Sequence, residues 1–287
     1  MLQEIGVLGK FKMIKRTITG TLLFLILASF FALKFVCKEF FDLLIVIIAV
    51  MGSIEFTKAL GDRVNLSSKI IAIAFAPLAI AVAVFFKDWL FYFLIGFIFI
   101  AMVVTLLTSK SDFGSKIAYT ILALIYPTIP LIFMSFINAM GDFSVFALCS
   151  LFFTSIATDT FAFFVGSKLK GTKLCPHISP NKTVSGAIGG LLGGMFVNVL
   201  VFLVFDMLNA NPLPAADLTS TMIYMALVGI VFSIATQIGD LVESALKRSL
   251  GIKDMGNLLP GHGGILDRVD GIIFSAVTVF ALYSFLI

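Results

Sequence analysis

The segment from Asp240 to Asp270, DLVESALKRSLGIKDMGNLLPGHGGILDRVD, holds the densest group of ionisable residues in this chain of 287 residues. Asp240, Glu243, Ser244 and Lys247 recur at the i, i+3, i+4, i+7 spacing of one helix face. The face begins where an apolar run ends, and ionisable groups there are costly unless they have a partner or a task. A salt-bridged helix surface would explain this face alone. The residues of the segment that we predict to be catalytic are Asp240, Lys247, Arg248, Lys253, Asp254, His262, Asp267 and Arg268.

A glycine-rich loop, PGHGG at positions 260–264, interrupts the segment and cannot be regular helix. Glycines allow backbone N–H groups to point inward and to approach an anion closely. Taken alone, the loop could be a plain turn between helices. Lysine and arginine side chains on both sides of it favour a polyphosphate site, because both side chains bind phosphate. We predict that Ser244, Gly263 and Gly264 bind the substrate.

Two acids, Asp267 and Asp270, stand three residues apart at the start of the last apolar run. They could be capping acids that the helix dipole stabilises. The alternative is a site for Mg²⁺, which prefers one or two carboxylates together with substrate phosphate oxygens and water. Asp240 and Asp267 would hold the ion between two elements, Glu243 and Asp270 are further candidate ligands, and a second metal ion is left open.

A second polar segment, residues 159–183, offers another set of candidate binding groups. Asp159 lies about two turns inside an apolar run, where a carboxylate is either functional or hydrogen-bonded to a neighbouring helix. Ser179, Asn181 and Thr183 could cap the helix that follows. Lys182 beside that N-terminus would add a cation where a phosphate is already favoured. The residues predicted to bind substrate in this segment are Asp159, Lys173, Ser179, Asn181 and Lys182.

The elements that carry these residues are predicted to be membrane helices. Hydrophobic residues make up 60% of the chain and charged residues 13%, far from the composition of a soluble domain. We predict nine spans of about 20 residues, the length that a hydrocarbon core requires: 17–36, 40–60, 68–86, 89–108, 116–138, 143–166, 183–205, 218–240 and 268–287. The expected fold is therefore an all-α polytopic membrane bundle that forms a single domain over 1–287.

The distribution of basic residues predicts the orientation of the bundle. With a cytoplasmic N-terminus, only Lys34, Lys38 and Lys87 of the 20 Lys and Arg residues fall outside. The two polar connections, 167–182 and 241–267, then both face the cytoplasm and would build the active site with the adjoining helix ends. We expect a multi-pass protein of the cell inner membrane or its equivalent. The scattered basic residues form no dense block and argue against a nucleic-acid partner.

Glycines repeat every four residues along the predicted span 183–205, as Gly186, Gly190 and Gly194, with Gly189 and Gly193 one position before the last two. Such a face of small residues allows two helices to pack closely. The packing could be within the chain or across a homodimer.

The segment from Ser244 to Asp270 resembles the signature of the phosphatidate cytidylyltransferases (CDP-diacylglycerol synthases). The matching residues are Ser244, Lys247-Arg248, Lys253-Asp254, Pro260, His262-Gly263-Gly264 and Asp267-Arg268-Val269-Asp270. SPNKTVSG at 179–186 is similar to a second family segment, but has Asn181 where the family has Lys and Ser185 where it has Glu. The resemblance implies Mg²⁺ dependence, CTP as donor, phosphatidate as acceptor and pyrophosphate as leaving group.

The residue types agree with that reaction. A phosphatidate phosphate is already an anion near neutral pH, so it can attack the α-phosphorus of CTP without a protein base. Catalysis would then consist of positioning and of charge neutralisation by metal, Lys and Arg.

Two alternatives remain at this stage. A CTP-dependent polyprenol or phytol kinase would need a base for its alcohol acceptor, and Asp254 or Asp267 could serve. A membrane transporter would place ionisable groups near the bilayer midplane on broken helices. Here they gather in two connections on one side, which favours an enzyme.

Overall fold

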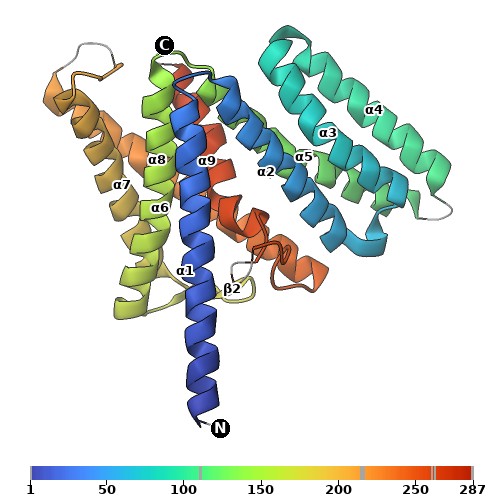
Figure 1. The fold of residues 1–287 in the computed structure, drawn as a ribbon, viewed down its shortest axis with the longest axis horizontal. Helices are drawn as coiled ribbons and strands as arrows, with labels where there is room; N and C mark the ends of the chain where they lie inside the picture. The colour runs from blue at the N-terminus through green and yellow to red at the C-terminus, as the bar shows by residue number, and fades with distance from the viewer. Residues whose placement is uncertain (1, 110–111, 214–216, 260, 262, 286–287) are drawn as a thin grey trace. The chain divides into compact units, whose positions relative to one another are not determined.

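The computed structural model describes residues 2–109, 112–213, 217–259, 261 and 263–285, with side chains from residue 17 onward. The described part is almost entirely helical (Figure 1). The α-helices are α1 Leu2–Leu33, α2 Glu39–Leu60, α3 Leu66–Phe85, α4 Leu90–Thr108, α5 Phe113–Asn138, α6 Phe143–Leu169, α7 Val184–Met207, α8 Leu218–Leu250 and α9 Leu266–Ser284. Two short 3-10 helices, η1 Gly61–Arg63 and η2 Lys87–Trp89, and two strands, β1 Lys173–Cys175 and β2 Ser179–Thr183, lie between them.

Seven segments in the described residues are long and apolar enough to cross a membrane. They are Glu39–Arg63, Leu66–Phe85, Lys87–Thr108, Phe113–Asn138, Phe143–Leu169, Val184–Met207 and Leu218–Leu250. The first predicted span corresponds to the shorter apolar stretch Thr17–Leu33 of α1, and the last to α9. The prediction of an all-α polytopic bundle is confirmed. Nine spans and a cytoplasmic N-terminus stay predictions.

The chain divides into two compact units, which we describe separately. The first unit is Met1–Ile129 with Ile252–Arg268, and the second is Pro130–Gly251 with Val269–Ile287.

In the first unit, α2 packs against α3 and α3 against α4. The segment 252–268 returns to α2 after the second unit. A Cβ on Gly52 of α2 would lie 2.9 Å from a methyl carbon of Leu266, so the small residue lets the returning segment approach the helix. This segment contains the predicted glycine-rich loop, 260–264.

In the second unit, the glycine-rich face of α7 packs against α6. A Cβ on Gly186 would lie 2.8 Å from the carbonyl oxygen of Ala162, and one on Gly190 would lie 2.9 Å from that of Thr158. Helix α8 joins this group through hydroxyl groups, since Thr158 Oγ1 donates to Ser233 Oγ over 2.8 Å. Small residues and buried hydroxyls replace apolar bulk here, as expected where membrane helices pack closely.

A β-hairpin links α6 to α7, where the sequence suggested only a polar loop (Figure 1). β1 and β2 are antiparallel, with Lys173 opposite Thr183 and Cys175 opposite Ser179. The hairpin presents β2 and the start of α7 to the C-terminal part of α8.

Candidate active site

A cavity of about 440 Å³ lies in the second unit where α6, the hairpin, α7 and α8 meet. It is lined by Asp159, Ala162, Phe163, Gly166, Ser167, Leu174, Asn181, Lys182, Thr183, Gly186, Ala187, Gln237 and Asp240. Asp159, Asn181, Lys182 and Asp240 were predicted from the sequence as site residues, and the fold brings them together from three elements. Their convergence on one cavity makes it the candidate active site.

Lys182 and Asp240 form an ion pair in this cavity, with Nζ 2.5 Å from Oδ2. Ser244 Oγ, one turn further along α8, donates to Asp240 Oδ1 over 3.4 Å. Both oxygens of Asp240 therefore face hydrogen-bond donors. The side chains of Lys182 and Asp240 remain 26% and 31% exposed, so a ligand can reach both.

The N-terminus of α7 also lies at this cavity. Thr183 is the N-cap, and its Oγ1 accepts from the N–H of Gly186 over 3.1 Å. Ser179 and Asn181, which could have capped this helix, lie in β2 instead, and Asn181 lines the cavity. Lys182 is the residue just before the cap, so a cationic side chain stands beside a helix N-terminus that already favours anions.

Ser185 and Arg248 hold the hairpin in place. Ser185 Oγ donates to the carbonyl oxygen of Lys170 and lies 3.2 Å from Thr183 Oγ1. Arg248 Nε, near the end of α8, donates to the carbonyl oxygen of Ile178 over 3.3 Å. Lys173 is exposed in β1, outside the lining of the cavity. Arg248 thus has at least one contact to protein backbone in addition to its predicted role toward phosphate.

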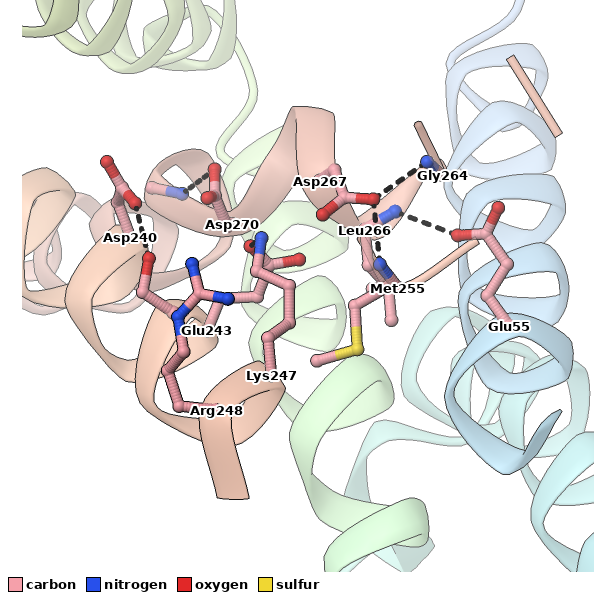
Figure 2. A network of polar contacts seen from close by, with 12 residues as sticks. Glu55, Asp240, Glu243, Lys247, Arg248, Met255, Gly264, Leu266, Asp267 and Asp270 are labelled. Carbon is pink, nitrogen blue, oxygen red and sulfur yellow. Dashed lines mark hydrogen bonds and ion pairs between the residues drawn. The ribbon is translucent and has the colours of Figure 1, made fainter. Parts of the chain in front are cut away.

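A second set of acidic side chains lies around Glu243 of α8, as Figure 2 shows. Glu243 itself is fully buried. Glu243 forms an ion pair with Lys247 one turn along α8, and Asp270 of α9 interacts with it. Asp270 also accepts from the N–H of Gly271 over 2.8 Å and interacts electrostatically with Asp240. The predicted helix face therefore exists, and its carboxylates gather between α8 and α9.

Asp267 lies in the first unit, in the first turn of α9 (Figure 2). Its Oδ2 accepts from the N–H of Met255 over 3.0 Å and from that of Gly264 over 2.7 Å. Gly263 has a positive φ of 81°, which a side chain would disfavour, and its carbonyl oxygen accepts from the N–H of Leu259 over 2.9 Å. Asp267 thus anchors the backbone that leads into α9 through the two hydrogen bonds from Met255 and Gly264. This arrangement resembles the helix-capping role that was the alternative to metal binding.

The remaining predicted residues of this loop are placed as follows. Lys253, Asp254 and Arg268 are exposed. His262, like Pro260, lies outside the described residues. Asp240 belongs to the second unit and Asp267 to the first, so their pairing around one metal ion stays a prediction. In the described part of the chain, no group of three or more His, Cys, Asp or Glu side chains is arranged to hold a metal ion.

Two residues with polar roles were not predicted. Gln237 lines the cavity and its Nε2 donates to the carbonyl oxygen of Ala187 over 3.3 Å. Glu55 of α2 accepts hydrogen bonds from the start of α9. An ionisable residue inside an apolar run is a signal that could have pointed to Glu55. No comparable signal marks Gln237.

The sequence model of the cytidylyltransferase family matches residues 14–286, which is almost the whole chain. This chain belongs to the cytidylyltransferase family. Relatives of this chain include proteins named phosphatidate cytidylyltransferase. The one from Bacillus subtilis (strain 168) is 38% identical over 173 residues, 59% of each chain. The one from Thermotoga maritima is 35% identical over 187 residues, 64% of this chain and 66% of the relative. The one from Rickettsia felis is 34% identical over 220 residues, 76% of this chain and 92% of the relative.

The alignments with the first two relatives span less than two thirds of those proteins. The family assignment rests instead on the match over residues 14–286, and it confirms the resemblance seen in the sequence.

Proposed function

We propose that this membrane protein transfers the cytidylyl group of CTP to phosphatidate, giving CDP-diacylglycerol and pyrophosphate in phospholipid biosynthesis. The observation that supports this most directly is the cavity in which Lys182, Asp240 and the N-terminus of α7 converge. The family and the names of its relatives supply the reaction class.

The phosphate of phosphatidate attacks the α-phosphorus of CTP, one phosphorus–oxygen bond forms, and pyrophosphate leaves. The attacking group is already an anion, so the protein needs to position it and to balance charge. Lys182 and the first N–H groups of α7 bind phosphate oxygens at the cavity. Ser244 orients Asp240 through its hydrogen bond. Lys247, Arg248, Lys253 and Arg268 supply further positive charge to the triphosphate.

Mg²⁺ is part of the proposal, and the side chains present suit it. Asp240, Glu243, Asp267 and Asp270 offer hard oxygen donors, and Mg²⁺ typically takes only one or two carboxylates and completes its shell with substrate phosphates and water. Asp240 already pairs with an ammonium group, so its surroundings favour a positive charge. When bound, Mg²⁺ neutralises charge on the triphosphate. We assign Asp240 and Asp267 as the principal ligands, and a second ion remains part of the proposal.

The proposal places both polar segments, 167–182 and 241–267, on the cytoplasmic side of the inner membrane or its equivalent, in one membrane-embedded catalytic domain. This side is where CTP is available. A homodimer through 183–205 would have to use the outer face of α7, with the exposed residues Ile188, Leu192 and Phe196, because the glycines of this helix are packed against α6.

The test is a transfer assay with purified protein, Mg²⁺, phosphatidate and CTP labelled at either the α- or the γ-phosphate. We expect the α label in an organic-soluble cytidine nucleotide and the γ label in pyrophosphate. Transfer of the γ label to lipid, with a polyprenol as acceptor, would show a kinase instead. Absence of both transfers in a well-folded preparation would contradict an enzymatic function.

A further inference from the structure

Glu55 is a buried carboxylate inside a helix that is apolar enough to cross a membrane. Its side chain is 6% exposed, and it lies within the apolar segment Glu39–Arg63. Burying a carboxylate is costly unless hydrogen bonds compensate it. An ionisable group in such a helix therefore indicates a partner that gains from the charge.

The partner of Glu55 is the backbone at the start of α9. Glu55 Oε1 accepts from the N–H of Ile265 over 3.0 Å, and Oε2 accepts from the N–H of Leu266 over 3.1 Å. Both oxygens are thus used, one for each amide (Figure 2 shows the bond to Leu266). These amides are among those that a helix start leaves without a helical partner, and the helix dipole favours a negative charge beside them.

Two glycines let the loop close around this carboxylate. A Cβ on Gly264 would lie 2.5 Å from Glu55 Oε2, and one on Gly256 would lie 2.6 Å from Oε1. Real side-chain carbons do not approach an oxygen so closely, so a side chain at either position would displace the Glu55 carboxylate. The loop therefore contacts Glu55 at both of its ends, near residue 256 and at residues 264–266.

Asp267 belongs to the same segment, 252–268, and also binds its backbone. It accepts from the N–H groups of Met255 and Gly264, each next in sequence to a residue that contacts Glu55. Gly264 lies against the Glu55 carboxylate and donates to Asp267, so both carboxylates contact the same stretch of loop backbone.

We propose that Glu55 is a positioning residue for catalysis, which holds the segment 252–268 on α2 so that Asp267 is presented in its working geometry. This inference rests on the proposed function for the role of Asp267. The competing explanation is that Glu55 contributes to stability alone. The two explanations predict different turnover rates. If Glu55 contributes to stability alone, a variant that remains folded keeps its turnover rate, whereas loss of a positioning residue lowers it.

The informative variant is Glu55→Gln, which keeps the length of the side chain but replaces one accepting oxygen by an amide nitrogen. That nitrogen cannot accept from an N–H group, so either Ile265 or Leu266 loses its partner. Glu39→Gln is the matched control, because Glu39 begins the same helix and its carboxylate bonds only to Cys37 among the hydrogen bonds seen for its side chain.

For each variant we would measure kcat, KM for both substrates, the Mg²⁺ concentration for half-maximal rate, thermal stability, and hydrogen exchange in a peptide that covers 263–268. In Glu55→Gln we expect faster exchange in that peptide, a kcat lower by at least about tenfold well below the melting temperature, and a raised Mg²⁺ requirement. KM for phosphatidate should stay within about twofold. Unchanged kcat and Mg²⁺ requirement would overturn the proposal, as would unchanged exchange.

A double-mutant cycle tests the same contact from the loop side, and its Gly256→Ala arm remains informative if Glu55→Gln folds poorly. Gly256→Ala pushes a methyl group against the Glu55 carboxylate and should lower kcat by at least about fivefold. In a Glu55→Ala background the methyl group has room, so the same change should cost less than about twofold. Gly96→Ala is the control, because a Cβ there meets nothing within 4 Å. Additive effects would contradict the contact.

These results separate the two proposals. If wild-type protein does not use CTP and phosphatidate, the proposed function fails, and unchanged exchange at 263–268 in Glu55→Gln would then overturn the Glu55 contact as well. If wild-type protein is active and Glu55→Gln is equally active, only the inference about Glu55 fails.

Discussion

Lys182 Nζ lies 2.5 Å from Asp240 Oδ2 and so joins β2 to α8 across the candidate cavity. Both side chains are partly exposed, and an ion pair of this kind contributes at most about 1 kcal/mol to stability. A stabilising role alone therefore explains the pair poorly. Each charge is, however, well placed for a ligand of opposite sign, a phosphate for Lys182 and a metal ion for Asp240.

Lys182→Met should abolish most of the turnover with little effect on folding. Loss of a cation that acts on the transition state typically costs on the order of 100-fold or more in rate, while the free energy of unfolding should fall by no more than about 1 kcal/mol. Steady-state rates with labelled CTP and a thermal melt measure both. Lys168→Met is the control, because Lys168 is exposed in the last turn of α6, just before the hairpin, and does not line the cavity. Equal effects of both changes would remove Lys182 from the phosphate site.

Asp240→Asn and Asp267→Asn should each lower turnover by two to three orders of magnitude, on the order of 3–4 kcal/mol of transition-state stabilisation. If both side chains bind one Mg²⁺ ion, the double variant should be little worse than either single variant. Turnover as a function of Mg²⁺ concentration, and removal of the ion with a chelator, provide the measurement.

The hydrogen bonds of Asp267 give this test a second readout. An asparagine can still accept from Met255 and Gly264 through its remaining oxygen, but without the charge. We therefore expect Asp267→Asn to lose about 1 kcal/mol of stability. A variant that loses this stability and keeps near-normal turnover would assign Asp267 to loop anchoring and exclude it as a metal ligand.

Gly190→Ala should destabilise the protein by about 1–3 kcal/mol, because its Cβ would lie 2.9 Å from the carbonyl oxygen of Thr158 and would push α6 and α7 apart. Gly96→Ala, in open surroundings on α4, should be neutral or stabilising by up to about 1 kcal/mol. Melting temperatures of both variants in detergent or lipid discs make the comparison. Equal melting temperatures would contradict the close packing of α6 on α7.

Single cysteines, placed after the native three are replaced, should reveal the orientation. Thr172→Cys and Asn257→Cys are exposed positions in the two polar segments and should react with membrane-impermeant thiol reagents from the cytoplasmic side only. Lys87→Cys, at an exposed position between α3 and α4, should react from the opposite side only. Labelling of positions 172 and 257 from opposite sides would contradict a single active site built from both segments.

The membrane class and the helical fold follow from the sequence itself, and so does the choice of the two polar segments as candidate sites. Runs of about 20 apolar residues leave few structures other than helices in a membrane, because every backbone polar group must be satisfied within the segment. Local spacing likewise predicted the charged face of Asp240, Glu243 and Lys247, since one helix turn determines which residues are neighbours.

The partners that lie far away in the sequence were decided by the tertiary structure alone. The pairing of Lys182 with Asp240 depends on a hairpin between α6 and α7 whose register no short-range pattern indicates. Glu55 could be recognised as an unusual charge in an apolar run, but its bonds to Ile265 and Leu266 span most of the chain. Hydrophobic burial and local hydrogen bonding act on each segment separately, whereas contacts between distant segments depend on how the helices and loops pack.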